Sequence, residues 1–103
     1  MGLDITIHRK NVPYGSDFWV NGRRRYGDIV DLMKRKYNYQ YGEDLLITWE
    51  IHSDLVSVLQ EMMLESMDDE VDYFLYNEFY HFLCDIMDDV CDKKQEWYFE
   101  ATW

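Results

Sequence analysis

The stretch Met67–Cys91, MDDEVDYFLYNEFYHFLCDIMDDVC, decides the fold because its apolar residues recur with helical spacing. On a helix of about 3.6 residues per turn, these side chains fall into one stripe. The stripe predicts a long helix near 69–92 that buries this side against a core. Its members are Val71, Leu75, Phe79, Phe82, Leu83, Ile86 and Val90.

Two further rows occupy the rest of this predicted helix. The row opposite the stripe is half apolar and consists of Tyr73, Asn77, Tyr80, Cys84, Met87 and Cys91. An acidic edge lies between the two and contains Glu70, Glu78, Asp85, Asp88, Asp89 and Asp92, together with His81. A helix with two apolar sides is either buried on both or docks a partner. Asp68 is the expected N-cap, and Lys93 and Lys94 suit the C-terminal end.

The composition predicts one folded domain over residues 1–103. An aromatic content of 17% argues against disorder, which requires low hydrophobicity. No apolar run is long enough for a spanning helix, and the N-terminus lacks the apolar core of a signal peptide. We therefore expect a cytoplasmic protein. Cys84 and Cys91 would lie about 10 Å apart on one helix, too far for a disulfide, so free thiols are expected.

The net charge of −11 is unevenly distributed along the chain. Residues 1–36 contain eight Lys or Arg and four Asp or Glu, whereas residues 37–103 contain two Lys and seventeen acids. Such a field disfavours nucleic acid or an anionic membrane as a direct partner and favours a basic protein surface. The alternative is that the acidity serves only solubility.

The N-terminal third predicts a strand followed by a hairpin. Leu3, Ile5 and Ile7 alternate with polar residues, which indicates a half-buried strand. A loop is expected over 11–17. Phe18–Val20 then meets Asn21-Gly22, a hairpin turn signal, so that Arg23–Tyr26 becomes the returning arm. Three cations suit an edge strand, and Arg23, Arg24 and Arg25 are also weak candidates for contact with an anion or nucleic acid.

The middle of the chain alternates between predicted helices and strands. A helix is expected over 28–37, a surface loop over 38–42, and a strand over 45–51, where a helix is the alternative. Ser53 is the expected N-cap of a helix that runs to about Ser66 and packs antiparallel against the next one. Its apolar face contains Leu55, Val58, Leu59, Met62 and Met63. A final strand over 97–102 precedes Trp103, for which we expect a packing role.

Metal and catalytic patterns are incomplete. Glu78 and His81 have the Glu-x-x-His spacing of di-iron bundles, but no second such pair exists, and Glu61 and Glu65 alone do not replace it. His81 with Cys84, Asp85 and Asp88 would need His8 or His52 to close around a metal. Glycines are scattered and no serine has a nucleophile-elbow context. We therefore expect no cofactor, no metal and no enzymatic activity.

Together these patterns predict an α+β fold, a small antiparallel sheet with about three helices. The expected function is a non-enzymatic protein–protein interaction module that docks a basic protein. In size and charge the chain resembles phage-borne anti-restriction and anti-CRISPR inhibitors, which implies mimicry of nucleic acid toward an enzyme that handles it. The alternatives are a homodimeric structural protein and a metal-dependent enzyme using Glu78 and His81. The predicted partner-binding residues are Glu70, Tyr73, Glu78, Tyr80, Asp85, Met87, Asp88 and Asp92.

Overall fold

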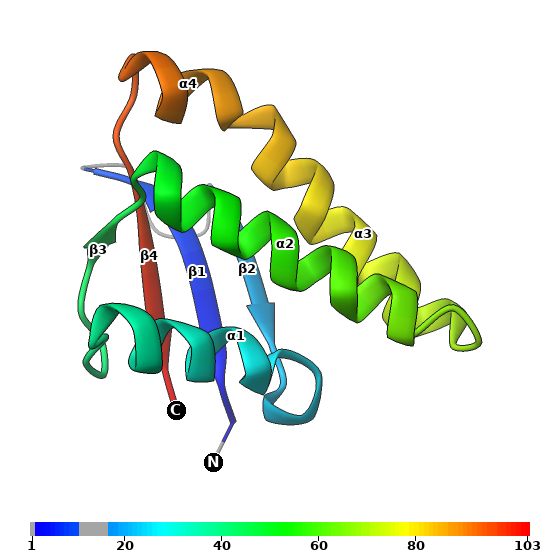
Figure 1. Cartoon of the computed structure of the whole chain (residues 1–103). Coiled ribbons are helices and arrows are strands. Elements are labelled where there is room, and N and C mark those ends of the chain that lie inside the picture. Colours follow the sequence, from blue (N-terminus) through cyan, green and yellow to red (C-terminus); the bar gives the residue numbers. More distant parts are fainter. Residues whose placement is uncertain (1, 11–16) are drawn as a thin grey trace. The chain divides into compact units, whose positions relative to one another are not determined.

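The computed structural model describes residues 2–10 and 17–103 and contains four strands and four helices in that part of the chain (Figure 1). Its contacts divide the chain into two compact units. The sheet unit comprises Met1–Ile47 with Gln95–Trp103, and the helical unit comprises Thr48–Lys94. The predicted α+β class with a small antiparallel sheet is confirmed. The single domain over 1–103 stays a prediction, and residues 11–16 of the expected loop lie outside the described residues.

The sheet has the strand order β2-β1-β4-β3, and every neighbouring pair is antiparallel. The central strands are β1 (Asp4–Arg9) and β4 (Trp97–Thr102), and the edges are β2 (Phe18–Asn21) and β3 (Leu45–Leu46). Both central strands agree with the alternating patterns in the sequence, so these two predictions are confirmed.

The two faces of the central strands differ in burial because successive side chains point to opposite sides. Ile5 pairs with Ala101 and Ile7 with Phe99, and all four are fully buried. On the other face, the positions between them are half-exposed and polar or aromatic: Thr6, His8, Tyr98 and Glu100. The sheet therefore has one apolar, buried face and one half-exposed face that presents polar and aromatic side chains.

The predicted hairpin at Asn21-Gly22 is wrong, although its first arm, Phe18–Val20, is a strand within β2. Gly22 has φ 119°, a conformation that favours glycine, and it leads directly into helix α1 (Arg23–Tyr37). The Tyr26 amide already donates to the Gly22 carbonyl at 2.9 Å, closing the first helical turn. A returning strand is not formed because the buried side chains here, Tyr26, Ile29, Val30 and Met33, recur with helical spacing. The expected helix over 28–37 is confirmed and begins earlier, at Arg23.

The loop after α1 is confirmed, although it is not wholly a surface loop. Asn38 ends the helix in the left-handed conformation at φ 54°, and Tyr39 is only 2% exposed. The predicted packing role of Trp103 is also confirmed. Its ring contacts Tyr41 edge-on at 5.1 Å between centroids, and the Lys34 Nζ lies 4.9 Å from its centroid.

The predicted strand over 45–51 is correct only at Leu45–Leu46. Helix α2 (Trp49–Glu65) begins directly after Thr48, whose hydroxyl accepts a hydrogen bond from the Ile51 amide at 3.3 Å. Thr48 is therefore the N-cap and Ser53 is not. The helix ends where expected, and its buried residues are Ile51, His52, Leu55, Leu59 and Met62. Ile51 belongs to this helical period, which explains why the strand stops early.

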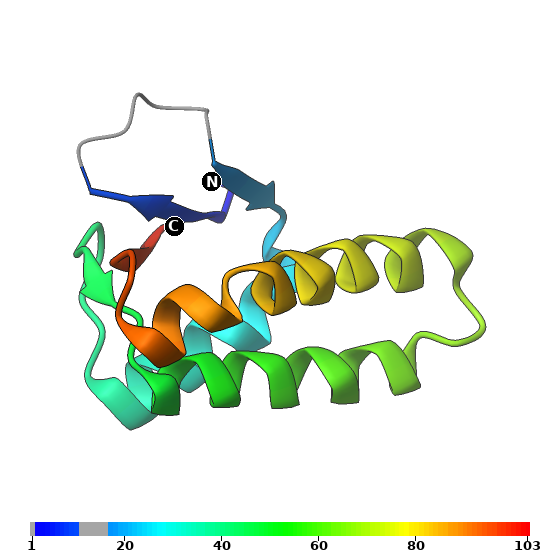
Figure 2. The ribbon, with the colours of Figure 1, turned by 90° about the horizontal axis from the view of Figure 1, so that it is seen from above.

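The helical stretch expected over 69–92 is confirmed, with one interruption. Helix α3 (Glu70–Asp85) runs antiparallel beside α2, and α4 (Met87–Asp92) follows after Ile86 (Figure 2). The N-cap is Asp69 rather than Asp68, since the Asp69 carboxylate accepts from the amides of Val71 and Asp72 at 3.1 Å each.

At the interruption near Ile86, a side chain of α2 bonds to the end of α3. The buried His52 donates from Nε2 to the Leu83 carbonyl at 2.6 Å. A carbonyl near a helix end lacks an intrahelical partner, and this ring supplies one. The Ile86 amide bonds to the Phe82 carbonyl at 3.2 Å, and a new helix starts from Met87.

The buried side of the 70–92 stretch differs from the predicted stripe at its N-terminal end. Phe79, Leu83, Ile86 and Val90 are buried as expected, whereas Leu75 and Phe82 are half-buried. Val71 is 62% exposed, so its predicted burial is wrong. The buried line instead passes through Asp72 and Tyr76, which continue the spacing of three and four that ends at Val90.

Candidate functional site

The charge of the molecule is divided sharply between the two units. The sheet unit contains eight Asp or Glu and eight Lys or Arg, so its formal net charge is zero. The helical unit contains thirteen acids and two Lys, so it carries the whole net charge of −11. A surface that attracts a basic partner by charge therefore belongs to the helical unit.

The predicted partner-binding residues all lie in the helical unit, and most are open to solvent. Tyr73 and Met87 are each 40% exposed, and Tyr80 is half-buried with its ring edge-on to His81 at 5.8 Å. The acidic members are exposed: Glu70, Glu78, Asp85, Asp88 and Asp92. Their accessibility is what a docking surface requires, and their binding role stays a prediction.

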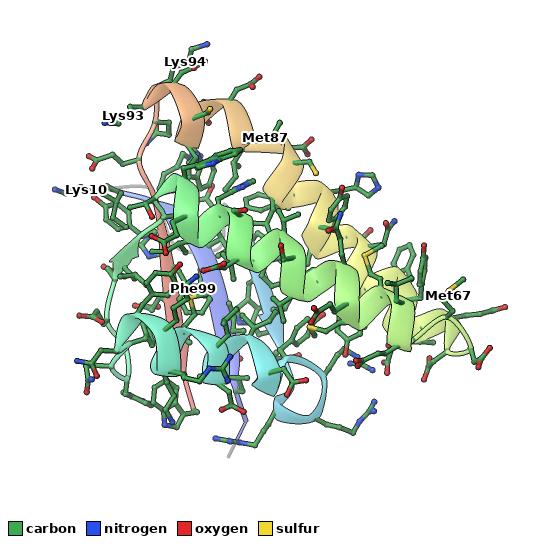
Figure 3. All side chains as sticks on the ribbon, viewed as in Figure 1. Lys10, Met67, Met87, Lys93, Lys94 and Phe99 are labelled. Atoms are coloured by element: carbon green, nitrogen blue, oxygen red, sulfur yellow. The ribbon has the colours of Figure 1, made fainter. Side chains whose placement is uncertain are left out.

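The sequence reasoning missed the most exposed apolar group of this unit. Leu64, Met67, Val71 and Phe74 are 71, 68, 62 and 58% exposed. They lie at the end of α2, in the turn and in the first turns of α3, with Met67 at the turn itself (Figure 3). Helices α2 and α3 form a helical hairpin, and we call these four residues together with Tyr73 the hairpin tip. One signal was present: Leu64, Met67 and Phe74 fitted none of the apolar faces assigned from the sequence.

Acidic residues surround the hairpin tip. Between positions 61 and 74 the chain has six Asp or Glu and no Lys or Arg. Asp72 is buried, and the exposed members are Glu61, Glu65, Asp68, Asp69 and Glu70. Exposed apolar side chains are thus combined with a dense negative charge.

The three arginines that were candidates for anion contact occupy the first turn of α1, not an edge strand. Arg23 and Arg24 are exposed and Arg25 is half-exposed. Cations at a helix N-terminus oppose the positive end of the helix dipole. Contact of these residues with an anion stays a prediction.

The structure does not bring Glu78 and His81 together with further metal ligands in the part of the chain that it describes. His52 is occupied by the Leu83 carbonyl. Within the described residues, a different group of metal-ligand side chains lies close together. It consists of His8, Asp44 and Glu100, whose ligand atoms all lie within 4.8 Å of one another. Cys84 and Cys91 are free, as expected.

Comparison with protein-family models, with curated proteins and with solved structures finds no match for this chain. Among the described residues, no helix has the length and apolar character needed to cross a membrane. The function must therefore be argued from the side chains and their surroundings.

Proposed function

We propose that the chain is a non-enzymatic protein–protein interaction module. Its docking surface is the hairpin tip with the adjacent acidic side of α3 and α4, and its partner is a basic protein surface. The observation that carries this proposal is the exposure of five large apolar side chains within eleven residues, Leu64 to Phe74, at an acidic helix turn. Exposed apolar groups rimmed by charge are typical of protein interaction sites.

The two components of this surface have separate roles. Phe74, Met67 and Tyr73 offer the kind of side chains that become buried anchors and hold affinity at protein interfaces. The carboxylates raise the rate of association with a partner of opposite charge. Binding is therefore expected to be fast at low salt and to slow as salt screens the charges.

The charge favours a basic partner over a second copy of the chain. Two helical units of charge −11 would repel each other across a homodimer seam built on this surface. A narrower form of the proposal is that the exposed carboxylates of α3 and α4 imitate a phosphate backbone and occupy the groove of a nucleic-acid-handling protein. The same charge opposes direct binding of nucleic acid.

The test first captures a basic protein with the unaltered chain. Binding of this purified partner is then measured for chains altered at single exposed positions. Phe74→Ser and Met67→Ser should abolish capture, since each removes an apolar anchor without opening the core. The matched control is Leu46→Ser, which removes a 41% exposed side chain of the sheet unit and should leave capture unchanged. Equal binding by Phe74→Ser and Leu46→Ser would exclude the hairpin tip as the docking surface.

Two further measurements separate the alternatives. Asp88→Asn and Glu70→Gln should slow association and leave dissociation nearly unchanged, whereas salt-insensitive association would mean that the acids serve only solubility. Sedimentation over a range of concentrations should give a monomer. A dimer that Phe74→Ser dissociates would replace the basic partner with a second copy of the chain.

A further inference from the structure

The geometry points to a binding site for one divalent transition-metal ion of the Zn²⁺ type, formed by His8, Asp44 and Glu100 on the half-exposed face of the sheet. This site belongs to the sheet unit and is independent of the docking surface proposed above. No pattern in the sequence predicts it, because His8 and Asp44 are 36 residues apart and Glu100 lies near the other end of the chain.

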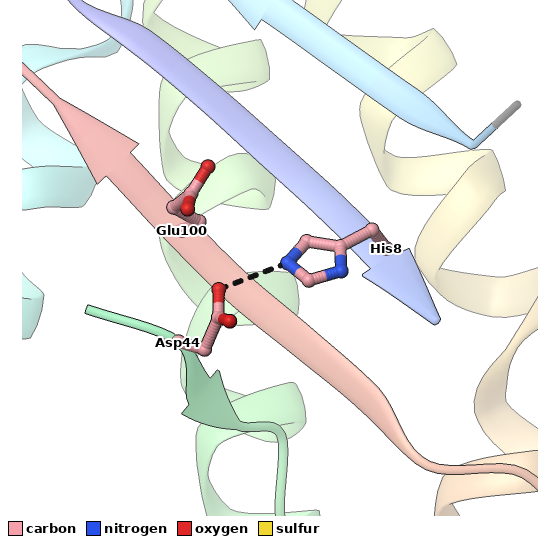
Figure 4. Close-up of side chains that lie close together, drawn as sticks. All are labelled: His8, Asp44 and Glu100. Atoms are coloured by element: carbon pink, nitrogen blue, oxygen red, sulfur yellow. Dashed lines mark hydrogen bonds and ion pairs between the residues drawn. The ribbon is translucent and has the colours of Figure 1, made fainter. Parts of the chain in front are cut away.

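Strand pairing brings the three residues together. In the register of β1 and β4, Thr6 pairs with Glu100 and His8 with Tyr98, so His8 is diagonal to Glu100 on one face. Leu45 pairs with Phe99 in β3 and β4, which places Asp44, one residue earlier, beside Glu100. Figure 4 shows His8 of β1 in contact with Asp44, the residue before β3, and Glu100 of β4 close to both.

The spacing of the ligand atoms suits a single ion. The His8 Nε2 lies 3.0 Å from the Asp44 Oδ1, and all three ligand atoms fall within 4.8 Å. A Zn²⁺ ion with ligands at about 2.0–2.2 Å separates neighbouring ligand atoms by roughly 3.0–3.5 Å. The imidazole and the Asp44 carboxylate already have this separation, and a rotamer change of the flexible Glu100 side chain would bring in the third ligand.

The hydrogen bonding of His8 prepares Nε2 to bind a cation. Its Nδ1 lies 3.1 Å from the Arg9 carbonyl, which only accepts, so Nδ1 carries a proton. The Nε2 atom is then the ring nitrogen that faces the Asp44 carboxylate, 3.0 Å from its Oδ1. Donation of the second ring N–H to a backbone carbonyl is the usual arrangement of a metal-binding histidine.

Two neighbours support the site. The Tyr98 ring stacks on His8 with centroids 5.9 Å apart and planes at 26°, which holds the imidazole in place. The negative charge at the site also acts on the nearby Tyr39. After burial, which is the main cause, the charges of Glu100, Glu43 and Asp44 contribute to raising the pKa of Tyr39 to about 12.

The donor set selects the class of ion. One imidazole and two carboxylates suit Zn²⁺ and related first-row ions, whereas Ca²⁺ prefers six or more oxygen ligands and Mg²⁺ a largely hydrated octahedron, as a rough rule. The side chains of His8 and Asp44 are 26% and 54% exposed, so water can complete the coordination.

The test is calorimetric titration of the purified chain with ZnCl₂, with nitrogen NMR of the histidine rings as a second readout. We expect one Zn²⁺ per chain and a large shift of the His8 Nε2 resonance. Asp44→Asn and Glu100→Gln should weaken binding by at least the roughly 10- to 100-fold that loss of an outer-shell partner costs. Excess CaCl₂ or MgCl₂ should not displace the ion.

Two matched variants serve as controls. Glu43→Gln removes an equal charge one residue from Asp44, and His81→Ala removes the exposed histidine of the helical unit; both should bind Zn²⁺ like the unaltered chain. Absence of Zn²⁺ binding would overturn the site and leave the contact of His8 with Asp44 as a hydrogen bond only. Unchanged binding by Asp44→Asn, loss in His81→Ala or displacement by Ca²⁺ would each overturn the site.

Discussion

The sheet unit and the helical unit have similar lengths, but the first is electrically balanced and the second is strongly acidic. The sheet unit balances eight acids with eight cations, whereas the helical unit sets thirteen acids against two Lys. Acidity that served only solubility could be spread over the whole surface. The acidity is instead confined to the unit that exposes Leu64, Met67 and Phe74, so the negative charge and the most exposed apolar side chains occur in the same unit.

The helices of the two units also begin differently. Helix α1 starts with Arg23, Arg24 and Arg25. It follows Gly22, which has no side chain that could cap the helix. Helix α3 starts with a carboxylate cap from Asp69 and acids in its first turn. The start of α3 is thus encoded locally, whereas α1 depends on burial of its apolar side.

The largest expected effect of a single substitution lies in the helical unit. His52→Ala removes the donor to the Leu83 carbonyl and leaves a buried acceptor beside a new cavity. We expect a loss of about 2–4 kcal/mol in the free energy of unfolding. Urea denaturation followed by circular dichroism measures it. His81→Ala, on the exposed side of α3, should change stability little, and equal effects of the two would contradict the role of His52.

The next effect concerns the sheet unit. The Tyr39 hydroxyl donates to the Glu43 carbonyl at 2.5 Å and accepts from the Ala101 amide at 2.6 Å. Tyr39→Phe leaves that buried amide without a partner, which should cost about 1–3 kcal/mol at neutral pH. Denaturant titration of both chains measures this loss, and a cost near zero would contradict the importance of the hydroxyl.

The same tyrosine predicts a pH dependence. Burial, with the charges of Glu100, Glu43 and Asp44, raises its pKa from 10.0 to about 12 in the folded chain. Because the folded state holds the proton more tightly, this contribution to stability is complete below pH 10 and is lost as the pH rises toward 12. The stability difference between the unaltered chain and Tyr39→Phe should therefore shrink over that interval. A constant difference would contradict the raised pKa.

A smaller effect tests the start of α3. Asp69→Ala should cost about 0.5–2 kcal/mol because two amides lose their capping acceptor. Asp68→Ala changes the neighbouring acid and should stay within about 0.5 kcal/mol. Thermal unfolding of the pair decides between them, and a larger loss in Asp68→Ala would restore the N-cap expected from the sequence.

The smallest effect tests the start of α1. Arg23→Glu places a negative charge at the positive end of the helix and should stabilise the chain by about 0.3–1 kcal/mol at low salt. The gain should fade in high salt, as measured by thermal unfolding at two ionic strengths. A loss of stability would mean that Arg23 makes contacts that outweigh the dipole.

Several elements could be predicted because their signals are local. Alternation at Ile5 and Ile7 predicted β1, alternation over 97–102 predicted β4, and helical spacing predicted most of α2 and the 70–92 stretch. The candidate docking surface was predicted less well. Its acids and Tyr73 were identified from the sequence, but the exposure of Val71 was not, because the buried side of a helix depends on what packs against it.

The amino-acid sequence by itself determined the α+β class, the positions of the main elements and the separation of charge, since periodicity and composition act within a few residues of chain. Only the tertiary structure decided that Asn21-Gly22 opens a helix, that α3 ends where His52 reaches Leu83, and that His8, Asp44 and Glu100 meet. These outcomes depend on strand register and on partners distant along the chain, and no local pattern of residues specifies such pairings.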